Sequence, residues 1–350
     1  MTLTELSYYS RKMLPFLVIF FLVVLIIFYL FKLIFLYLQL QPKDKVININ
    51  PVFGKIRRPA LKEPLASSSA DFVLDTIEGQ PITATDTAKI YFLPPSYSRL
   101  KFLQQIYLMA KAVGFDTENV KHSLVNTEAT FDDGQQKMTI DITNFNFSYE
   151  YKLRELNRDN FFENSRLPNE GEIQNKAANF LNAVGRYPEE LAQGKRNLVY
   201  LTYEPDSQTI IIVPQSAVSN MVEVDFYRAD IDNFPIVSPK YFNSPNYVMI
   251  AFSKDGFRIV KAQVNFFERS KDQVGIYPIK TGEAAWQELK NNQEIVINPA
   301  SGKTVNIKKM FLGYFDPDVY QNYLQPVYVF LGDNNFVGYV AAIDNKYLQN

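Results

Sequence analysis

An apolar run near the N-terminus is the feature of the sequence that most constrains the fold. Residues Met13 to Phe31 are nineteen positions without a charged side chain, and after Lys32 the run continues to Leu40. In a helix that rises about 1.5 Å per residue, about 20 apolar residues cover the roughly 30 Å hydrocarbon core of a bilayer. We therefore predict a short tail over residues 1–12 and a transmembrane helix over residues 13–40 that contacts the lipid bilayer.

A cleaved signal peptide is the competing interpretation of this run. Signal peptides usually have an apolar region of about 7 to 15 residues, followed by small residues at the cleavage site. Here the run continues into Tyr37-Leu38-Gln39-Leu40-Gln41-Pro42, which contains no pair of small residues. These features favour an uncleaved, single-pass anchor.

The charges on either side of the run bear on its orientation. Basic residues tend to stay on the cytoplasmic side of a membrane. Taken alone, the count mildly favours a cytoplasmic C-terminal part. The basic residues are Arg11 and Lys12 before the run, and Lys43, Lys45, Lys55, Arg57 and Arg58 after it.

Composition excludes several classes of function. The 36 basic and 37 acidic residues balance, and the sequence pI of about 6.0 is unlike that of a basic nucleic-acid-binding surface, so we predict no nucleic-acid partner. The absence of cysteine rules out disulfides, thiolate metal sites and cysteine nucleophiles. The phosphate-binding, dinucleotide-binding, esterase and zinc-protease motifs are absent. We therefore predict no catalytic residue, no metal site, no cofactor and no enzymatic activity.

Three sets of polar residues are candidates for chemistry, and a structural role is favoured for each. His122 is the single histidine and has no recognisable triad partners, so we predict a surface or half-buried loop residue. Asp225, Asp230 and Asp232 lack the glycine of a calcium loop, so we predict a solvated strand end or turn. Asp316, followed by Pro317, has the pattern of a helix cap.

The rest of the chain divides into an extended segment and two expected units. Residues 41–69 contain four prolines and the run Ser67 to Ser69, which predicts an extended stalk. We expect a first α+β unit over residues 70–165. A second α+β unit, with a C-terminal helix and an antiparallel meander, is expected over residues 166–350.

Helices alternate with strand patterns in these units. One helix is predicted after a Ser98 cap and ends at Gly114, a second runs from about Glu172 to Gly185, and a third begins near Thr281. Short loops between the strands predict antiparallel pairing, so the fold class is α+β, with helices packed on curved antiparallel sheets. The similar sequences 112–115 and 183–186 suggest a duplicated helix-plus-meander unit. The predicted strands cover residues 127–131, 137–142, 197–203, 209–214, 247–252, 258–267, 304–314, 325–331 and 336–343.

Several short sequences together form a recognisable pattern. They are Phe53-Gly54-Lys55, Tyr277-Pro278-Ile279-Lys280, Glu283-Ala284-Ala285-Trp286 with Leu289, Leu312-Gly313-Tyr314, Tyr323 to Phe330, and Gly338 to Ala342. This pattern resembles a family of uncharacterised single-span membrane proteins from reduced-genome bacteria. More distantly, the architecture is similar to that of the YycH/YycI regulators, single-span proteins whose outer domains modulate a sensor kinase. The resemblance implies an extracytoplasmic domain and supplies no catalytic residues.

The resulting hypothesis is a non-enzymatic, membrane-anchored extracytoplasmic domain that binds a protein partner in the cell envelope, in a regulatory or scaffolding role. The 22 tyrosines and 28 phenylalanines leave a second interpretation open, a glycan- or peptide-binding module that uses exposed aromatic residues. A hydrolase based on carboxylates is the third, and it requires acidic side chains that converge in a pocket.

Overall fold

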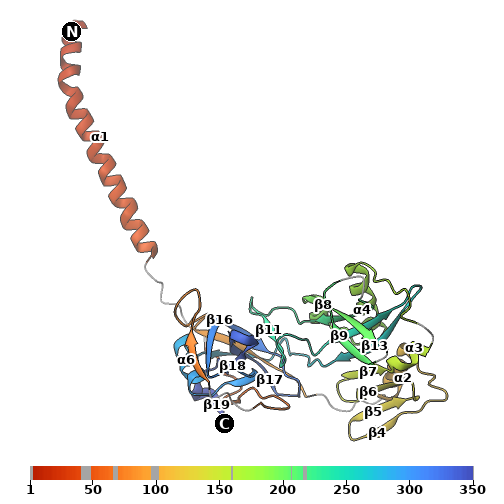
Figure 1. Cartoon of the computed structure of the whole chain (residues 1–350). Coiled ribbons are helices and arrows are strands. Elements are labelled where there is room, and N and C mark those ends of the chain that lie inside the picture. Colours follow the sequence, from red (N-terminus) through yellow and green to blue (C-terminus); the bar gives the residue numbers. More distant parts are fainter. Residues whose placement is uncertain are drawn as a thin grey trace. The chain divides into compact units, whose positions relative to one another are not determined.

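The computed structural model describes residues 3–40, 49–65, 70–95, 102–158, 161–205, 207–215 and 219–349. The chain divides into two compact units, residues 1–48 and residues 49–350 (Figure 1). The first contains the N-terminal helix, and the second contains the sheets and the remaining helices. The predicted α+β fold class is confirmed.

Helix α1 (Leu3–Leu40) forms the first unit. It is the one helix in the described ranges that is long and apolar enough to cross a membrane, with a candidate span of Met13–Leu36 and a mean hydropathy of 3.1. The helix begins at Leu3, so most of the predicted tail over residues 1–12 is helical. A helix is the expected form for such a run, because it pairs its own backbone polar groups without help from water.

A nine-stranded antiparallel sheet organises one part of the second unit, with its strands in the order β4-β5-β6-β7-β13-β12-β10-β8-β9. Helices α2 (Phe102–Val113) and α4 (Glu170–Val184) pack on one face of it, where Ile106, Ile173 and Leu181 are fully buried in a single core. The strands are β4 (Ser123–Val125), β5 (Glu128–Asp132), β6 (Gln136–Asp141), β7 (Phe147–Tyr151), β8 (Arg196–Glu204), β9 (Thr209–Ile212), β10 (Met221–Phe226), β12 (Tyr247–Phe252) and β13 (Phe257–Val264).

This sheet is built from two segments with a similar order of elements. In the first, α2 is followed by β4, β5, β6 and β7 from the edge of the sheet inward. In the second, α4 is followed by β8, β10, β12 and β13, again inward, except that β9 follows β8 in the chain and lies outside it at the edge. Strand β7 pairs with β13 where the two segments meet. Both helices end at a glycine with positive φ, Gly114 at 107° and Gly185 at 75°. The topology therefore has the form of the predicted duplicated helix-plus-meander unit.

A second, mixed sheet contains the C-terminal strands in the order β11-β16-β17-β18-β15. Strand β3 pairs with β14 and β17, and β2 pairs in parallel with β16. Helix α6 (Gly282–Lys290) covers this sheet, with the Trp286 ring 6.2 Å from that of Phe330. The strands are β2 (Asp71–Leu74), β3 (Thr87–Phe92), β11 (Ile236–Val237), β14 (Val274–Pro278), β15 (Ile295–Asn298), β16 (Thr304–Phe315), β17 (Tyr323–Gly332) and β18 (Val337–Ala341).

Short elements complete the second unit. The described part of the expected stalk belongs to it: β1 (Ile56–Arg57) pairs with β19 (Leu348–Gln349), and Ile56 is buried. The stalk prediction is wrong for this part because its apolar side chains pack in the C-terminal core, while residues 41–48 and 66–69 lie outside the described residues. The other short elements are α3 (Leu153–Arg158), α5 (Glu189–Ala192), η1 (Asp333–Asn335) and η2 (Asn345–Tyr347).

The expected division near residue 165 does not match the sheets. Residues 70–165 supply β2 and β3 to the mixed sheet and β4 to β7 to the nine-stranded sheet. Residues 166–350 likewise supply strands to both sheets. The boundary is wrong because long-range pairing, such as that of β7 with β13, decides which strands share a sheet.

Side-chain caps define the N-terminal ends of two of the three predicted helices. The Asn169 side chain accepts a hydrogen bond from the backbone N–H of Glu172 at the start of α4, at 2.9 Å. At the start of α6, the Thr281 hydroxyl accepts one from the backbone N–H of Ala284, at 3.2 Å. Both caps satisfy backbone donors that would otherwise lack partners. The predicted cap of the first helix, Ser98, lies outside the described residues.

Candidate functional site

The two faces of the nine-stranded sheet differ in chemistry. Side chains alternate between faces along a strand, and directly paired residues of neighbouring strands share a face. On the face that packs against α2 and α4, one continuous row of paired residues is entirely apolar or aromatic. The row consists of Leu198, Val224, Val248, Ala262, Tyr149, Met138 and Phe131.

The opposite face carries a row of polar side chains, which we call the polar row. It is one residue out of register with the apolar row, so the same strands present opposite chemistry on their two faces. Asp225, Tyr247 and Gln263 lie on three adjacent strands near its middle. The polar row consists of Asn197, Asp225, Tyr247, Gln263, Ser148, Thr139 and Thr130.

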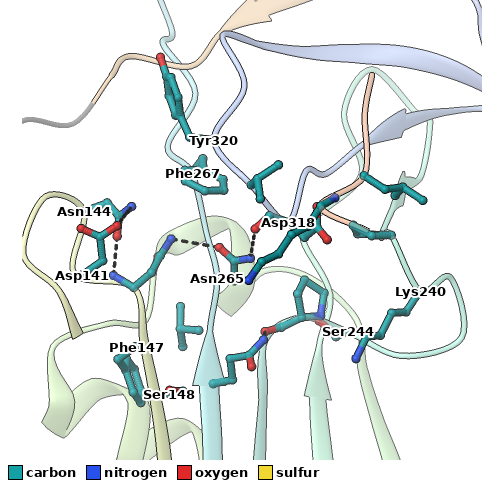
Figure 2. Close-up of a pocket in the computed structure, with 18 of the residues that line it drawn as sticks. Asp141, Asn144, Phe147, Ser148, Lys240, Ser244, Asn265, Phe267, Asp318 and Tyr320 are labelled. Carbon is teal, nitrogen blue, oxygen red and sulfur yellow. Dashed lines mark hydrogen bonds between the residues drawn. The ribbon is translucent and has the colours of Figure 1, made fainter. Parts of the chain in front are cut away.

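A pocket of about 760 Å³ opens beside the polar row (Figure 2). Thr139, Ser148, Tyr247 and Gln263 from the row line one part of it. Segments of the mixed-sheet part of the unit line the rest, among them the loop 318–320 after β16. The pocket is a junction between the two sheets, which is a common location for binding sites. Most of its lining side chains are amides, hydroxyls and charged groups.

Two asparagines organise the floor of the pocket. The Asn146 amide N–H donates to the Asn265 side-chain oxygen at 3.1 Å, and the Asn265 amide N–H donates to the backbone oxygen of Asp318 at 2.7 Å. The Asn146 oxygen in turn accepts from the Arg186 guanidinium at 2.9 Å. This chain links β7, the end of β13 and the loop after β16, and thereby fixes the position of the pocket walls (Figure 2).

An acidic turn forms a second wall. The Asp141 carboxylate accepts hydrogen bonds from the backbone N–H and the hydroxyl of Thr143, at 2.8 and 2.6 Å, and from the Asn144 amide at 3.1 Å. The turn includes Phe145 with a φ of 60°, a conformation that non-glycine residues rarely adopt. These local bonds preorganise the turn, so Asp141 and Asn144 are held at the pocket by their own backbone (Figure 2).

Aromatic residues lie at the rim and at the base. Tyr320 is 40% exposed, and its ring lies edge-on to Phe267 with the centroids 5.9 Å apart. Its hydroxyl donates to the backbone oxygen of Leu93 at 2.9 Å, which fixes the ring at the rim. Tyr247 of the polar row is half-buried, and burial raises the pKa of its hydroxyl to about 12. The pocket therefore combines one accessible aromatic face with hydrogen-bonding groups.

Two carboxylates lie near the pocket on the same sheet face. Glu223 and Asp225 are two positions apart on β10, and the Asp225 carboxylate accepts from the backbone N–H of Ser244, a lining residue, at 3.4 Å. Burial, and next the charge of Asp225, raises the pKa of Glu223 to about 7. Burial raises the pKa of Asp225 to about 6. Neither carboxylate lines the pocket, so the arrangement does not place the pair against a substrate.

A buried ion cluster joins α5 to the segments that follow β10, β13 and β16. The Arg228 side chain is fully buried and donates to Glu190 of α5 at 2.6 Å and to Asp316 at 2.7 Å. Arg269 donates to the other oxygen of Glu190 at 2.9 Å. The charges of these carboxylates raise the pKa of Arg228. Asp316 is therefore not the predicted helix cap; it is the buried partner of an arginine from the other sheet.

The remaining sequence candidates do not form a site. His122 is half-buried and lies against Tyr107, with its Nδ1 3.2 Å from the tyrosine hydroxyl, as predicted for a loop histidine. Asp230 is exposed, and Asp232 forms an ion pair with Lys89 at 2.9 Å. Asp225 is fully buried, so the predicted solvated position is wrong for this residue, because the strands on either side of β10 cover it. The described residues contain no group of three or more histidine or acidic side chains placed to hold a metal ion.

Sequence reasoning missed the residues that build the pocket. Asp141, Asn144, Asn146 and Asn265 come from two strand ends far apart in the sequence. The one available signal is the run Asp141 to Asn146, which is rich in turn-forming residues between two strand patterns. Nothing in the sequence indicates that Asn265 contacts it.

Comparisons with known protein families and with curated protein sequences found no match. Among solved structures, an uncharacterized protein from Eubacterium rectale ATCC 33656 is similar, with 14% identity and a TM-score of 0.35, over 73% of this chain and 82% of that one. YycH from Bacillus subtilis is similar with 13% identity and a TM-score of 0.36, over 73% of this chain and 55% of YycH. Both likenesses are weak and concern the fold alone.

Proposed function

We propose that this protein is a single-pass membrane protein whose second unit faces the outside of the cytoplasmic membrane and binds a protein partner in the cell envelope, without enzymatic activity. The observation that carries the proposal is α1. Its span Met13–Leu36 is 24 residues long, and its side chains are not buried against the rest of the chain. An apolar surface of this size needs a nonpolar environment, and a bilayer provides one.

The pocket and the polar row are the surface that we assign to the partner. Amide side chains such as Asn144 and Gln263 offer both donors and acceptors, which suit the backbone of a peptide segment. Tyr320 offers an apolar face beside them. Fixed polar groups around an apolar contact give specificity more than raw affinity, as a regulatory contact requires.

Site-specific photo-crosslinking in cells tests this assignment. A photoreactive amino acid replaces Ser148, which is exposed and lines the pocket, or Lys303, which is exposed and not part of the lining. We expect one reproducible partner to be crosslinked from position 148, and less of it when Lys240→Glu is added in the pocket. Equal crosslinking from positions 148 and 303 would contradict the assignment.

A glycan-binding role is the second candidate, because the pocket has an accessible aromatic ring. Tyr320, Asn144, Asp141 and Asn265 line the same pocket, and such a combination can stack on a sugar ring and bond its hydroxyls. Calorimetric titration with soluble cell-wall oligosaccharides separates the two candidates. Binding that is lost in Tyr320→Ala would favour the glycan, whereas absence of binding together with a position-148 crosslink would favour the protein partner.

A further inference from the structure

The exposed edge of the nine-stranded sheet carries an unusual strand, β9. It pairs with β8 on one side, and no other strand in the described ranges pairs with it. Its isoleucines Ile210, Ile211 and Ile212 are 42%, 41% and 75% exposed. Exposed edges are usually protected by charges, proline or a bulge, and β9 contains none of them within Thr209–Ile212.

The bonding pattern of β9 shows which of its backbone groups are free to pair. The backbone N–H of Val213 donates to Tyr200 of β8 at 3.0 Å. Hydrogen bonds alternate along an antiparallel pair. The backbone N–H and C=O groups of Thr209 and Ile211 therefore also point toward β8, and those of Ile210 and Ile212 point away from it. Ile210 and Ile212 can therefore pair with another strand, and Ile211 between them has its backbone groups directed toward β8.

We propose that β9 pairs with β9 of a second copy of this chain, antiparallel and about a twofold axis at Ile211. In this register Ile210 of one copy lies opposite Ile212 of the other, and each outward pair exchanges two hydrogen bonds. The strand has no charge, so self-pairing brings no like charges together. Isoleucine also favours strands, because its β-branched side chain packs well against cross-strand neighbours.

The ends of the strand select this register. A shift of the axis to Ile210 would require pairing with Gln208, which has a φ of 54° and is not extended. A shift to Ile212 would require a donor at position 214, which is Pro214 and has no N–H. The axis at Ile211 uses both outward residues of both copies and avoids both ends.

The sheet face also favours a strand in this position. Ile210 and Ile212 lie opposite Tyr203 and Leu201 of β8, which belong to a buried apolar cluster on that face. The same residues of a second copy would continue that apolar surface across the new pair. A contact of four residues per copy is far smaller than the 1,200–2,000 Å² of stable interfaces, so the pairing needs a raised local concentration. Confinement of both copies to the bilayer supplies this local concentration, and this step rests on the proposed anchor.

Single-cysteine crosslinking in lipid vesicles tests the pairing, because the natural chain has no cysteine. At a non-hydrogen-bonded pair the Cα atoms are about 4.5 Å apart, within the range that a disulfide spans. In Ile211→Cys the two cysteines would face each other at the axis. In Ile210→Cys they would be displaced diagonally and farther apart.

Two exposed positions elsewhere serve as matched controls. Ile77→Cys lies in a fully exposed turn, and Val125→Cys lies on β4 at the opposite edge of the sheet, where the side chain is 67% exposed. We expect the disulfide dimer of Ile211→Cys to form at least about tenfold faster than those of both controls. Adding Ile212→Pro removes an outward N–H that the monomer does not use, and should lower the rate to that of Ile77→Cys.

The outcomes are distinguishable. A rate for Ile211→Cys no greater than that of Ile77→Cys overturns the proposal, as does faster crosslinking at Val125→Cys. Faster crosslinking at Ile210→Cys than at Ile211→Cys overturns the register. Flotation of the same vesicles shows first whether the chain is membrane-bound, so failure of the anchor is separated from failure of the pairing.

Discussion

Replacing Arg228 by methionine is the sharpest test of how the two sheets are held together. Arg228 follows β10 of the nine-stranded sheet, whereas its partner Asp316 follows β16 of the mixed sheet. The arginine side chain is 0% exposed and that of Asp316 is 4% exposed. Methionine has a similar length and no charge, so the variant leaves Asp316 buried without its partner, while Glu190 keeps Arg269.

The expected cost follows from this burial. Removing one member of a buried ion pair costs about 3–5 kcal/mol of unfolding free energy, because the remaining charge has lost both its water and its partner. The double variant Arg228→Met with Asp316→Leu removes both charges, and we expect it to be at least about 2 kcal/mol more stable than the single variant. Arg154→Met is the surface control, because the side chain of Arg154 is 61% exposed, and should change stability by less than about 0.5 kcal/mol.

Urea unfolding of the purified protein measures these changes with two probes. Trp286 is the single tryptophan and packs on the mixed sheet, so its fluorescence reports that part, while circular dichroism reports both sheets. If the cluster joins the sheets, Arg228→Met shifts both transitions to lower urea. A single variant that loses less than about 1 kcal/mol, or a double variant no more stable than the single one, would refute the reasoning.

Two further predictions concern ionisation and packing in the second unit. The pKa of Glu223 is raised to about 7 in the folded protein from a usual 4.5, so the folded state binds the proton more tightly and the stability that this group contributes falls as pH rises from about 4.5 through 7. The free energy of unfolding of Glu223→Gln should therefore exceed that of the natural protein at pH 8 by about 1 kcal/mol, and by at most roughly 3, whereas the two should be nearly equal at pH 4. Thermal unfolding across this pH range measures the difference. A difference that does not change with pH would contradict the prediction. At Gly282 an added Cβ would lie 2.3 Å from the backbone oxygen of Ile82, so Gly282→Ala should cost about 1–3 kcal/mol in urea unfolding. Gly256→Ala, whose Cβ would come no nearer than 3.7 Å to Ser253, should be close to neutral, and equal effects of the two would contradict this packing.

Local patterns predicted the elements far better than their assembly. The strand expected over residues 247–252 matches β12, and the helix expected after Thr281 begins at that cap. Alternation and caps are properties of neighbouring residues, so a sequence displays them directly. Strand β10 was not predicted as an element, because Glu223 and Asp225 interrupt its apolar pattern.

The candidate site could not be predicted in the same way. The acidic turn at Asp141 and the amide of Asn265 meet only because β7 and β13 pair, over a sequence separation of more than a hundred residues. Asp316 followed by Pro317 has the local pattern of a helix cap, and the buried Arg228 overrides it. Long-range ion pairs of this kind leave no local signal in a single sequence.

Labelling of single cysteines in intact cells tests the central claim, an anchored chain whose second unit lies outside the membrane. Ile77→Cys places a fully exposed thiol on the second unit, and Thr2→Cys places one before α1. The account predicts that a membrane-impermeant maleimide labels the membrane-bound Ile77→Cys protein in intact cells and labels Thr2→Cys only after permeabilisation. Labelling of Thr2→Cys alone in intact cells, or recovery of the labelled Ile77→Cys protein in soluble form, would contradict it.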